Sequence, residues 1–147
     1  MGFFARFRPV LLTVEACRCF AQDPCFEKIK RSFESIGFKW QEELVDKLKT
    51  SSNLDRVTSL IMDKAFFLPD RFEILIDARG FRPEDIKCML TANSLEVSAQ
   101  KEDRTDNAQK RISLTRQYVL PQNAVPEKGQ CCLSSDGMLL VTAPWLR

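Results

Sequence analysis

The chain contains no histidine among its 147 residues. Histidine is the commonest general base and metal ligand in proteins, so its absence removes both roles. Ser-His-Asp triads and Cys-His nucleophile pairs are excluded, as are zinc sites with a histidine ligand. The sequence also lacks the Gly-x-x-x-x-Gly-Lys loop that cradles nucleotide phosphates. We therefore expect no catalytic residues, no nucleotide and no other cofactor.

None of the six cysteines belongs to a Cys-x-x-Cys pair, which is the spacing of zinc knuckles and thioredoxin-type sites. We expect reduced thiols that pack as small hydrophobic groups, and no metal site. Two alternatives remain open. One is a redox-responsive thiol, which would have to be exposed. The other is a thiol enzyme in which Lys87 activates Cys88, although the sequence offers no base for it.

Long apolar runs and concentrated charge are also missing. The net charge is +2 with the two signs interspersed, whereas a nucleic-acid-binding protein would show a basic stripe. The apolar run at residues 10–14 ends at Glu15 and is too short for a signal peptide or a membrane span. We expect no nucleic-acid partner and no membrane insertion. We expect the protein to be cytoplasmic, with the nucleus as a second location. Mitochondrial targeting remains open, because the first residues carry arginine and no acid.

Residues 1–66 have a helical, aromatic-rich pattern. Asp23 and Pro24 resemble an N-cap followed by proline at the first helical position, and apolar residues recur at helical spacing from Phe26 to Ile36. Further helices are expected at 41–49 and 54–61. Trp40 and seven of the eleven phenylalanines lie in the first forty residues: Phe3, Phe4, Phe7, Phe20, Phe26, Phe33 and Phe38. They form either an ordinary helix core or a partly exposed surface that contacts other chains.

From about residue 67 the hydrophobic period changes from 3.6 to 2, which predicts strands. We expect strands at 72–78, 86–90, 95–99, 112–120, 130–133 and 138–143. Residues 101–110 are expected to form a charged loop, and Gly137 to supply the positive φ of a tight hairpin turn. Strands at this spacing with no intervening helix indicate an immunoglobulin-like antiparallel sandwich at 67–147.

Four sequence blocks between residues 70 and 145 resemble the α-crystallin domain of the small heat shock proteins. They are residues 72–77 with the Phe81-x-Pro83-Glu84-Asp85 turn, residues 93–97, residues 116–121, and residues 133–139 with Ala143-Pro144. Each block alone is common, but their order and spacing are typical of the family. The resemblance implies an ATP-independent holdase that binds unfolding proteins and prevents their aggregation.

The resemblance also implies a dimer formed by the strand at 112–120, because pairing with its twin would satisfy an unpaired strand edge. The implied interface residues are Ile112, Leu114, Arg116 and Tyr118, with Asp106 as the acidic partner of Arg116. A guanidinium desolvated there needs such a carboxylate, so replacing Arg116 by glycine should cost the dimer about 3–5 kcal/mol. The alternative is that Arg116 is an exposed charge on an ordinary strand.

A groove between the two edge strands at 86–90 and 130–133 is the implied binding site for extended apolar segments. The expected client-binding residues are the groove residues and several phenylalanines: Ile86, Cys88, Leu90, Cys131, Leu133, Phe3, Phe4, Phe7, Phe26 and Phe33. Cys88 and Leu90 could instead simply fill the core.

The sequence ends at Arg147 without the Ile-x-Ile or Ile-x-Val segment that links family members into large assemblies. The expected partners are therefore non-native client proteins and a second copy of the chain, in a dimer or a small oligomer. The alternative function is a dedicated protein-binding or cytoskeleton-associated module on the same scaffold, including a co-chaperone sandwich.

Overall fold

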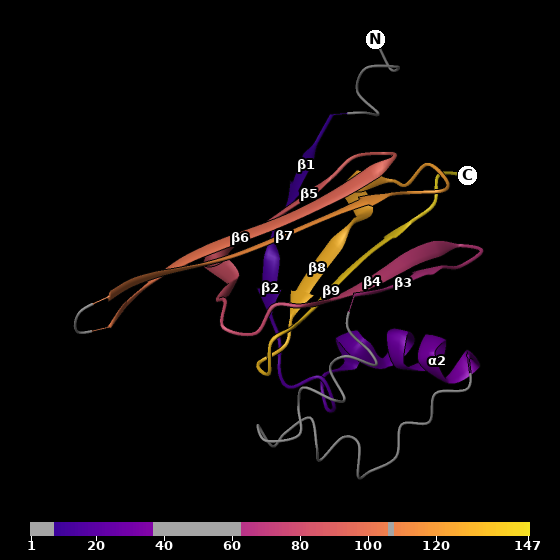
Figure 1. Cartoon of the computed structure of the whole chain (residues 1–147). Coiled ribbons are helices and arrows are strands. Elements are labelled where there is room, and N and C mark those ends of the chain that lie inside the picture. The colour runs from indigo at the N-terminus through magenta and orange to yellow at the C-terminus, as the bar shows by residue number, and fades with distance from the viewer. Residues whose placement is uncertain (1–7, 37–62, 106–107) are drawn as a thin grey trace.

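The computed structural model describes residues 8–36, 63–105 and 108–147. Its strands form two packed sheets (Figure 1). The four-stranded sheet has the order β1 (Val10–Leu12), β5 (Ile86–Leu90), β6 (Ser94–Thr105) and β7 (Ala108–Val119). The five-stranded sheet has the order β2 (Val14–Ala16), β8 (Gln130–Leu133), β9 (Met138–Pro144), β4 (Arg71–Asp77) and β3 (Lys64–Phe67). This architecture confirms the predicted mainly-β sandwich.

The main core lies between the two sheets and follows the predicted alternation. Phe72, Ile74 and Ile76 of β4 point inward and are fully buried, as expected for alternate residues of a strand. They pack in one cluster with Cys88 and Leu90 of β5 and with residues of β6 and β9. Trp145 closes one end of this core, and its indole Nε1 donates a 2.6 Å hydrogen bond to the Leu68 carbonyl.

A second core lies on the outer face of the five-stranded sheet, beneath α2 (Glu27–Ser35) (Figure 1). Ile29 and Phe33 of α2 pack there against Leu75 of β4 and Leu140 of β9. Strand β4 is therefore buried on both faces. The predicted helix start is confirmed in part, since Asp23 caps the 3-10 turn η1 (Pro24–Phe26), which leads into α2.

The prediction of a charged loop at 101–110 is wrong. Strand β6 runs to Thr105 and β7 begins at Ala108, so the two form a long antiparallel ribbon that leaves the body of the sandwich (Figure 1). Backbone hydrogen bonds hold such a ribbon together. It needs no buried face, so the sequence shows no hydrophobic alternation there.

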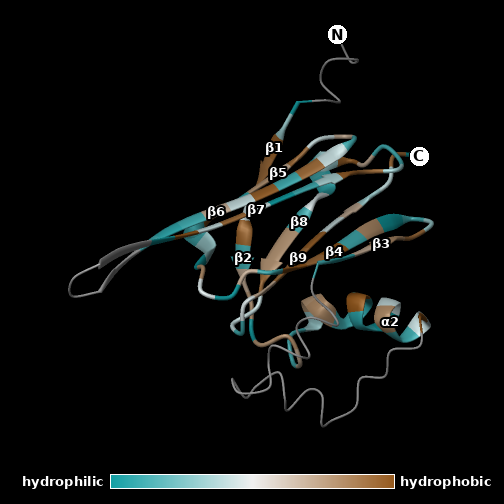
Figure 2. Ribbon diagram, in the orientation of Figure 1, coloured by the Kyte–Doolittle hydropathy of each residue, from teal (hydrophilic) through white to brown (hydrophobic). Residues whose placement is uncertain are grey.

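The N-terminal region is helical at Glu27–Ser35, but the helical expectation fails at residues 10–16. Strand β1 pairs antiparallel with β5 and β2 pairs parallel with β8, so this short segment adds a strand to each sheet. Figure 2 shows that β1 is hydrophobic along its length. Tertiary pairing has converted an apolar run into strand because it buries part of that run against the sandwich.

Two further 3-10 turns, η2 (Pro83–Asp85) and η3 (Pro126–Lys128), precede β5 and β8. The helices expected at 41–49 and 54–61 fall outside the described residues, as do Phe3, Phe4, Phe7, Phe38 and Trp40. Within the described ranges, no helix combines the length and hydrophobicity needed to cross a bilayer.

A candidate protein-binding groove and an edge strand

The groove lies between β5 and β8, one strand from each sheet. Its expected residues Ile86, Cys88, Leu90, Cys131 and Leu133 are all buried. The structure corrects the expectation that these strands are open edges, because the chain's own residues 10–16 cover both of them. We call residues 10–16 the N-terminal strap. The sequence signal for this strap is the alternation of Val10, Leu12 and Val14, which the apolar Leu11 between them hides.

Leu12 is the residue that fills the groove. Its side chain is 7% exposed and belongs to the main core, whereas its neighbour Leu11 is 62% exposed. Gly129 makes room for it, because a Cβ on Gly129 would lie 2.9 Å from Leu90 Cδ2 and 3.0 Å from Leu12 Cδ1. The N-terminal strap therefore lies against β5 and β8 in the manner of β-strand addition, with backbone pairing to both strands and the Leu12 side chain inserted in the core.

Cys88 and Cys131 face each other from β5 and β8 in the floor of the groove. A hydrogen bond with Cys88, together with burial, holds the pKa of the Cys131 thiol well above its usual range. Nucleophilic cysteines have the opposite environment, which stabilises the thiolate. The raised pKa keeps the Cys131 thiol neutral, and Cys88 is fully buried beside it. This environment offers no support for the thiol-enzyme alternative.

Strand β7 forms one edge of the four-stranded sheet. Ile112, Leu114, Arg116 and Tyr118 share the face of β7 that turns toward the sandwich. Along this face Leu114 is buried, Tyr118 packs against the core, and Ile112 is exposed. Val119 near the end of the strand is 85% exposed. No strand within residues 8–36, 63–105 and 108–147 pairs with the outer edge of β7, and a long strand edge of this kind is a template for pairing with another chain.

Arg116 makes an ion pair with Asp63, which precedes β3 in the other sheet. Its Nε lies 3.3 Å from Asp63 Oδ1, and a second nitrogen lies 3.4 Å from Oδ2. The pair joins the two sheets at one side of the sandwich. Asp106, the expected partner, lies outside the described residues. Nearby, burial and the Asp63 charge raise the pKa of Tyr118 above its ordinary value.

The phenylalanines expected to bind clients divide into two groups. Phe26 and Phe33 are buried against the outer face of the five-stranded sheet, where Phe26 contacts Phe20 with tilted rings and Phe33 and Phe66 pack edge to face. In this chain they form a helix core, which was one of the two interpretations of the aromatic pattern. The other three lie outside the described residues.

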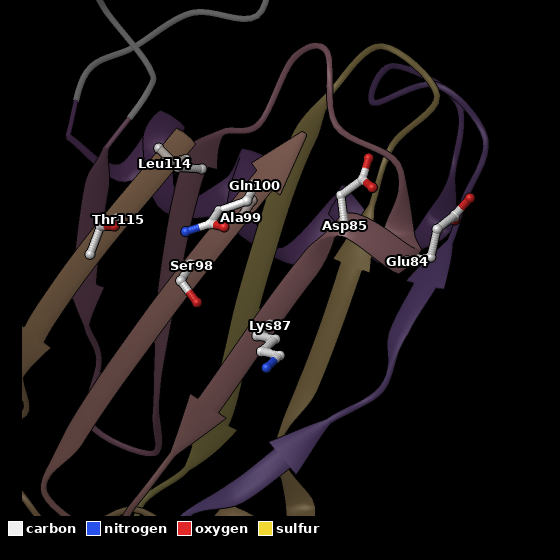
Figure 3. A pocket seen from close by; sticks show the side chains of 8 residues that line it. All are labelled: Glu84, Asp85, Lys87, Ser98, Ala99, Gln100, Leu114 and Thr115. Carbon is white, nitrogen blue, oxygen red and sulfur yellow. The ribbon is translucent and has the colours of Figure 1, made fainter. Parts of the chain in front are cut away.

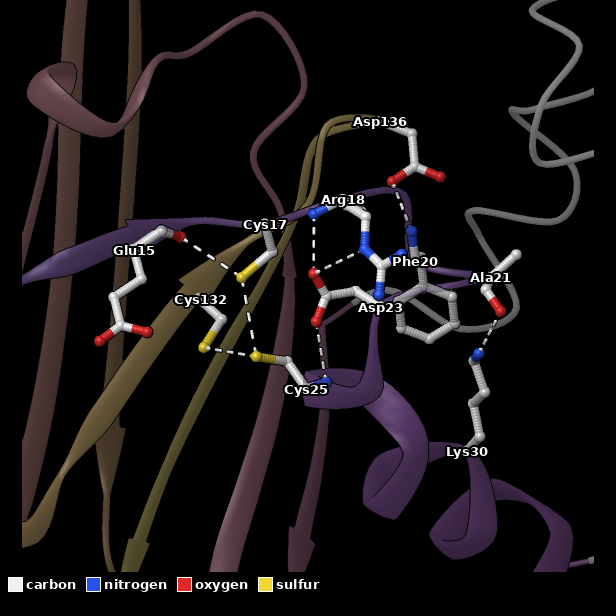
Figure 4. A network of polar contacts seen from close by, with 10 residues as sticks. All are labelled: Glu15, Cys17, Arg18, Phe20, Ala21, Asp23, Cys25, Lys30, Cys132 and Asp136. Carbon is white, nitrogen blue, oxygen red and sulfur yellow. Dashed lines mark hydrogen bonds and ion pairs between the residues drawn. The ribbon is translucent and has the colours of Figure 1, made fainter.

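Three cysteines meet beside the second core, which the sequence did not predict (Figure 4). Cys25 Sγ lies 3.7 Å from Cys17 Sγ and 3.5 Å from Cys132 Sγ. Cys17 directly follows the N-terminal strap, Cys25 lies in η1 and Cys132 lies in β8, so no local spacing could have revealed them. Burial and the hydrogen bond with Cys25 raise the pKa of Cys17 to about 11.

A hollow of about 260 Å³ opens between η2 and the face of β5, β6 and β7 (Figure 3). Its walls are mainly polar, with Glu84, Asp85, Lys87, Ser98 and Gln100 among them. The Asp85 carboxylate is already engaged, because it accepts a 2.9 Å hydrogen bond from the Arg82 backbone. The lining residues do not present a nucleophile bonded to a base, which a hydrolytic site would need.

The chain is similar to known α-crystallin proteins over its sandwich. It is 34% identical over 76 residues to alpha-crystallin B chain of Squalus acanthias, covering 51% of this chain and 43% of that protein. It is 33% identical over 76 residues to alpha-crystallin A chain of Gallus gallus, covering 51% and 44%. The chain therefore matches less than half the length of these relatives.

The fold comparison agrees with the sequence comparison. Stress-induced protein 1 from Caenorhabditis elegans aligns with a TM-score of 0.51 and 23% identity, covering 56% of this chain and 84% of that one. This likeness supports the sandwich architecture. The model of the Hsp20/alpha crystallin family matches residues 66–147, which is more than half of the chain. The chain thus belongs to the Hsp20/alpha crystallin family.

Proposed function

We propose that the chain is an ATP-independent holdase whose binding groove is covered by its own N-terminal strap. The observation that carries this proposal is the occupied groove. Three residue pairs join β1 to β5, three join β2 to β8, and Leu12 enters the core. An apolar stretch of an unfolding client offers the same chemistry. Family membership supports the same conclusion, because the family is one of chaperone-like proteins.

A client would have to displace the strap. The strap has the advantage of being tethered, which gives it a high effective concentration near the groove. Its own hold is limited, because it pairs over few residues and Leu11 and Glu15 remain exposed. Heating or a high client concentration would therefore favour exchange. We propose that this competition keeps the groove closed until unfolding chains accumulate.

Release of the strap would also loosen the segment that carries α2. Phe20, Phe26 and Phe33 would then become available as apolar client-binding surface. Covering about 400 Å² of client surface at about 25 cal/mol per Å² gives roughly 10 kcal/mol before ordering costs. This is enough for transient holding.

We further propose that two copies pair through β7. The support is its position at a sheet edge and the exposure of Ile112 and Val119 along it. Pairing would satisfy the unpaired backbone groups of both edges. The strap covers β5 and β8, so it leaves the β7 edge free for this contact.

The holdase proposal is tested by light scattering of a heat-aggregating client without nucleotide. We expect the reduced full chain to suppress scattering at sub-stoichiometric ratios, while an equal mass of an inert globular protein does not. Unchanged scattering at an equimolar ratio would refute the proposal.

A dedicated binding module is the second candidate. It is favoured by the burial of Phe26 and Phe33, which leaves the described surface with only scattered large apolar side chains. Affinity capture with the folded chain should then yield one stoichiometric folded partner, and the scattering assay should show no general protection.

A further inference from the structure

The cysteines Cys17, Cys25 and Cys132 present three sulfur atoms that all lie within 4.8 Å of one another. No other His, Cys, Asp or Glu side chain joins them in the ranges that the structure describes. Cys25 is exposed, Cys17 is half-buried and Cys132 is buried. The cluster therefore has a closed side toward the protein and an open side toward water.

The number and spacing of the sulfurs fit a bound metal ion better than they fit a disulfide or the packing of thiols as small hydrophobic groups. A disulfide joins two cysteines, and its sulfurs must approach to about 2.05 Å. Here two sulfurs lie near Cys25 Sγ, that of Cys132 at 3.5 Å and that of Cys17 at 3.7 Å. Thiols that serve as small hydrophobes do not need their sulfurs to converge. Four ligands about 2.3 Å from a tetrahedral zinc ion are separated by about 3.8 Å, close to the 3.5 and 3.7 Å observed.

We propose that Cys17, Cys25 and Cys132 form a three-thiolate site for a thiophilic d10 metal ion, Zn²⁺, with a water molecule as the fourth ligand on the exposed side of Cys25. Cysteine thiolates select soft or borderline ions such as Zn²⁺ and Cu⁺ over Mg²⁺ or Ca²⁺. Each thiol gives up its proton when its sulfur bonds the ion.

The surroundings hold the ligands in place. The Cys17 backbone N–H donates a 2.8 Å hydrogen bond to the Leu133 carbonyl, and the Cys25 N–H donates a 3.0 Å bond to the Asp23 carboxylate. Cys132 lies inside β8, so its Cα is fixed by strand pairing on both sides. Apolar residues of the second core, including Phe26 and Leu140, shield one side of the cluster. Outer contacts of this kind orient metal ligands.

An ion at this site would join three separate parts of the chain. Cys17 directly follows the N-terminal strap, Cys25 lies in η1 just before α2, and Cys132 belongs to the groove strand β8. Bound Zn²⁺ would therefore fasten the strap and the helix to the sandwich. This site stands on the cysteine geometry alone and does not depend on the proposed chaperone activity.

The test is titration of the reduced full chain with Zn²⁺, followed by Co²⁺ as a spectroscopic probe. We expect one ion per chain, with a thiolate-to-cobalt charge-transfer band and tetrahedral d–d bands. Cys25→Ser should weaken Zn²⁺ binding by more than the ~10–100-fold that loss of an outer-shell partner costs. Cys19→Ser is the matched control, because Cys19 is close in sequence but lies outside the cluster, and it should bind as the wild type does.

A second readout is the hydrogen exchange of residues 10–26. Zn²⁺ should slow this exchange in the wild type and in Cys19→Ser. In Cys25→Ser, Zn²⁺ should not change the exchange rate of residues 10–26. A parallel titration with Cu⁺ under reducing conditions tells which ion the site prefers, and stronger binding of Cu⁺ would overturn the assignment to zinc. Failure to bind, equal binding by both serine variants, or formation of a Cys25 disulfide in place of binding would each overturn the site.

Discussion

The Ser32 hydroxyl of α2 donates a hydrogen bond to the buried carboxylate of Glu73 on β4. Glu73 is 1% exposed and also lies 3.5 Å from the Arg71 guanidinium. A charge at this depth is tolerated only when it is paired and hydrogen-bonded. The contact therefore fixes α2 over the outer face of the sheet, in addition to the apolar packing around it.

Removal of the Ser32 hydroxyl should destabilise the docked helix. Ser32→Ala leaves the Glu73 carboxylate without this donor, and hydrogen bonds to charged groups contribute about 1.5–3 kcal/mol. Chemical denaturation should show a loss of that size. Ser35→Ala is the control on the same helix, because Ser35 is exposed and its hydroxyl bonds only the Ser32 backbone carbonyl rather than a buried charge; it should cost less than Ser32→Ala, about 1 kcal/mol or less. Equal losses in the two variants would contradict the role of Ser32.

Two glycines in the described part of the chain have a positive φ, and they should respond differently to alanine. Gly80 has φ +91° with open space around its Cα, so Gly80→Ala should cost about 1–2 kcal/mol for the left-handed backbone alone. Gly137 has φ +92°, and a Cβ there would lie 2.7 Å from Arg79 Cα. Gly137→Ala should therefore cost about 1–3 kcal/mol more through overpacking. Denaturation midpoints of both variants check this, and equal losses would refute the contact.

Arg116 and Asp63 can be separated by paired variants. The pair is about 40% exposed on both sides, so its own worth is about 1 kcal/mol or less. Asp63→Asn should lose only that amount. If Arg116 also contributes to pairing through β7, Arg116→Gly should raise the dimer dissociation constant well beyond the effect of Asp63→Asn. Analytical ultracentrifugation measures both, and an unchanged dissociation constant in Arg116→Gly would remove that residue from the interface.

Tyr118 is the only tyrosine of the chain, so its ionisation can be followed directly by phenolate absorbance. Burial and the Asp63 charge raise its pKa in the folded state above the ordinary value of about 10. The unfolded chain releases this proton first. The contribution of Tyr118 to stability is therefore present below pH about 10 and is lost as pH rises further. If the phenolate absorbance showed Tyr118 ionising with a pKa of about 10 or lower, the burial of its hydroxyl would be contradicted.

The sandwich could be predicted from sequence because its strands carry a clear signal of alternation. Phe72, Ile74 and Ile76 alternate with other residues, and Gly137 marks the hairpin turn. The exact bounds of β5 and β8 followed from the same pattern. The ribbon beyond residue 100 could not be predicted, since exposed strands held by backbone bonds need no such pattern.

The features that involve distant parts of the chain could not be predicted from the sequence either. The strap could be identified only from its pairing with β5 and β8, which lie more than seventy residues further along the chain. Cys17 and Cys132 come together for the same reason. Glu73 alternates with the inward-facing residues of β4, and it is buried because α2 covers the outer face of the strand. Each of these depends on tertiary contacts that local periodicity does not encode.

A pair of neighbouring variants tests most directly whether the strap covers a groove that can bind clients. Leu12 is inserted in the groove whereas Leu11 faces solvent. Truncating a buried leucine to alanine costs about 2–5 kcal/mol, so Leu12→Ala should favour release of the strap, and Leu11→Ala should not. The molar ratio that half-suppresses client scattering is the quantity to compare, after circular dichroism has shown that both variants are folded. We expect Leu12→Ala to protect the client at a lower molar ratio than Leu11→Ala and the wild type do. Faster hydrogen exchange of residues 10–16 in Leu12→Ala would show that the strap is released. If both variants then suppressed scattering at the same molar ratio, the groove beneath the strap would not be a client-binding site.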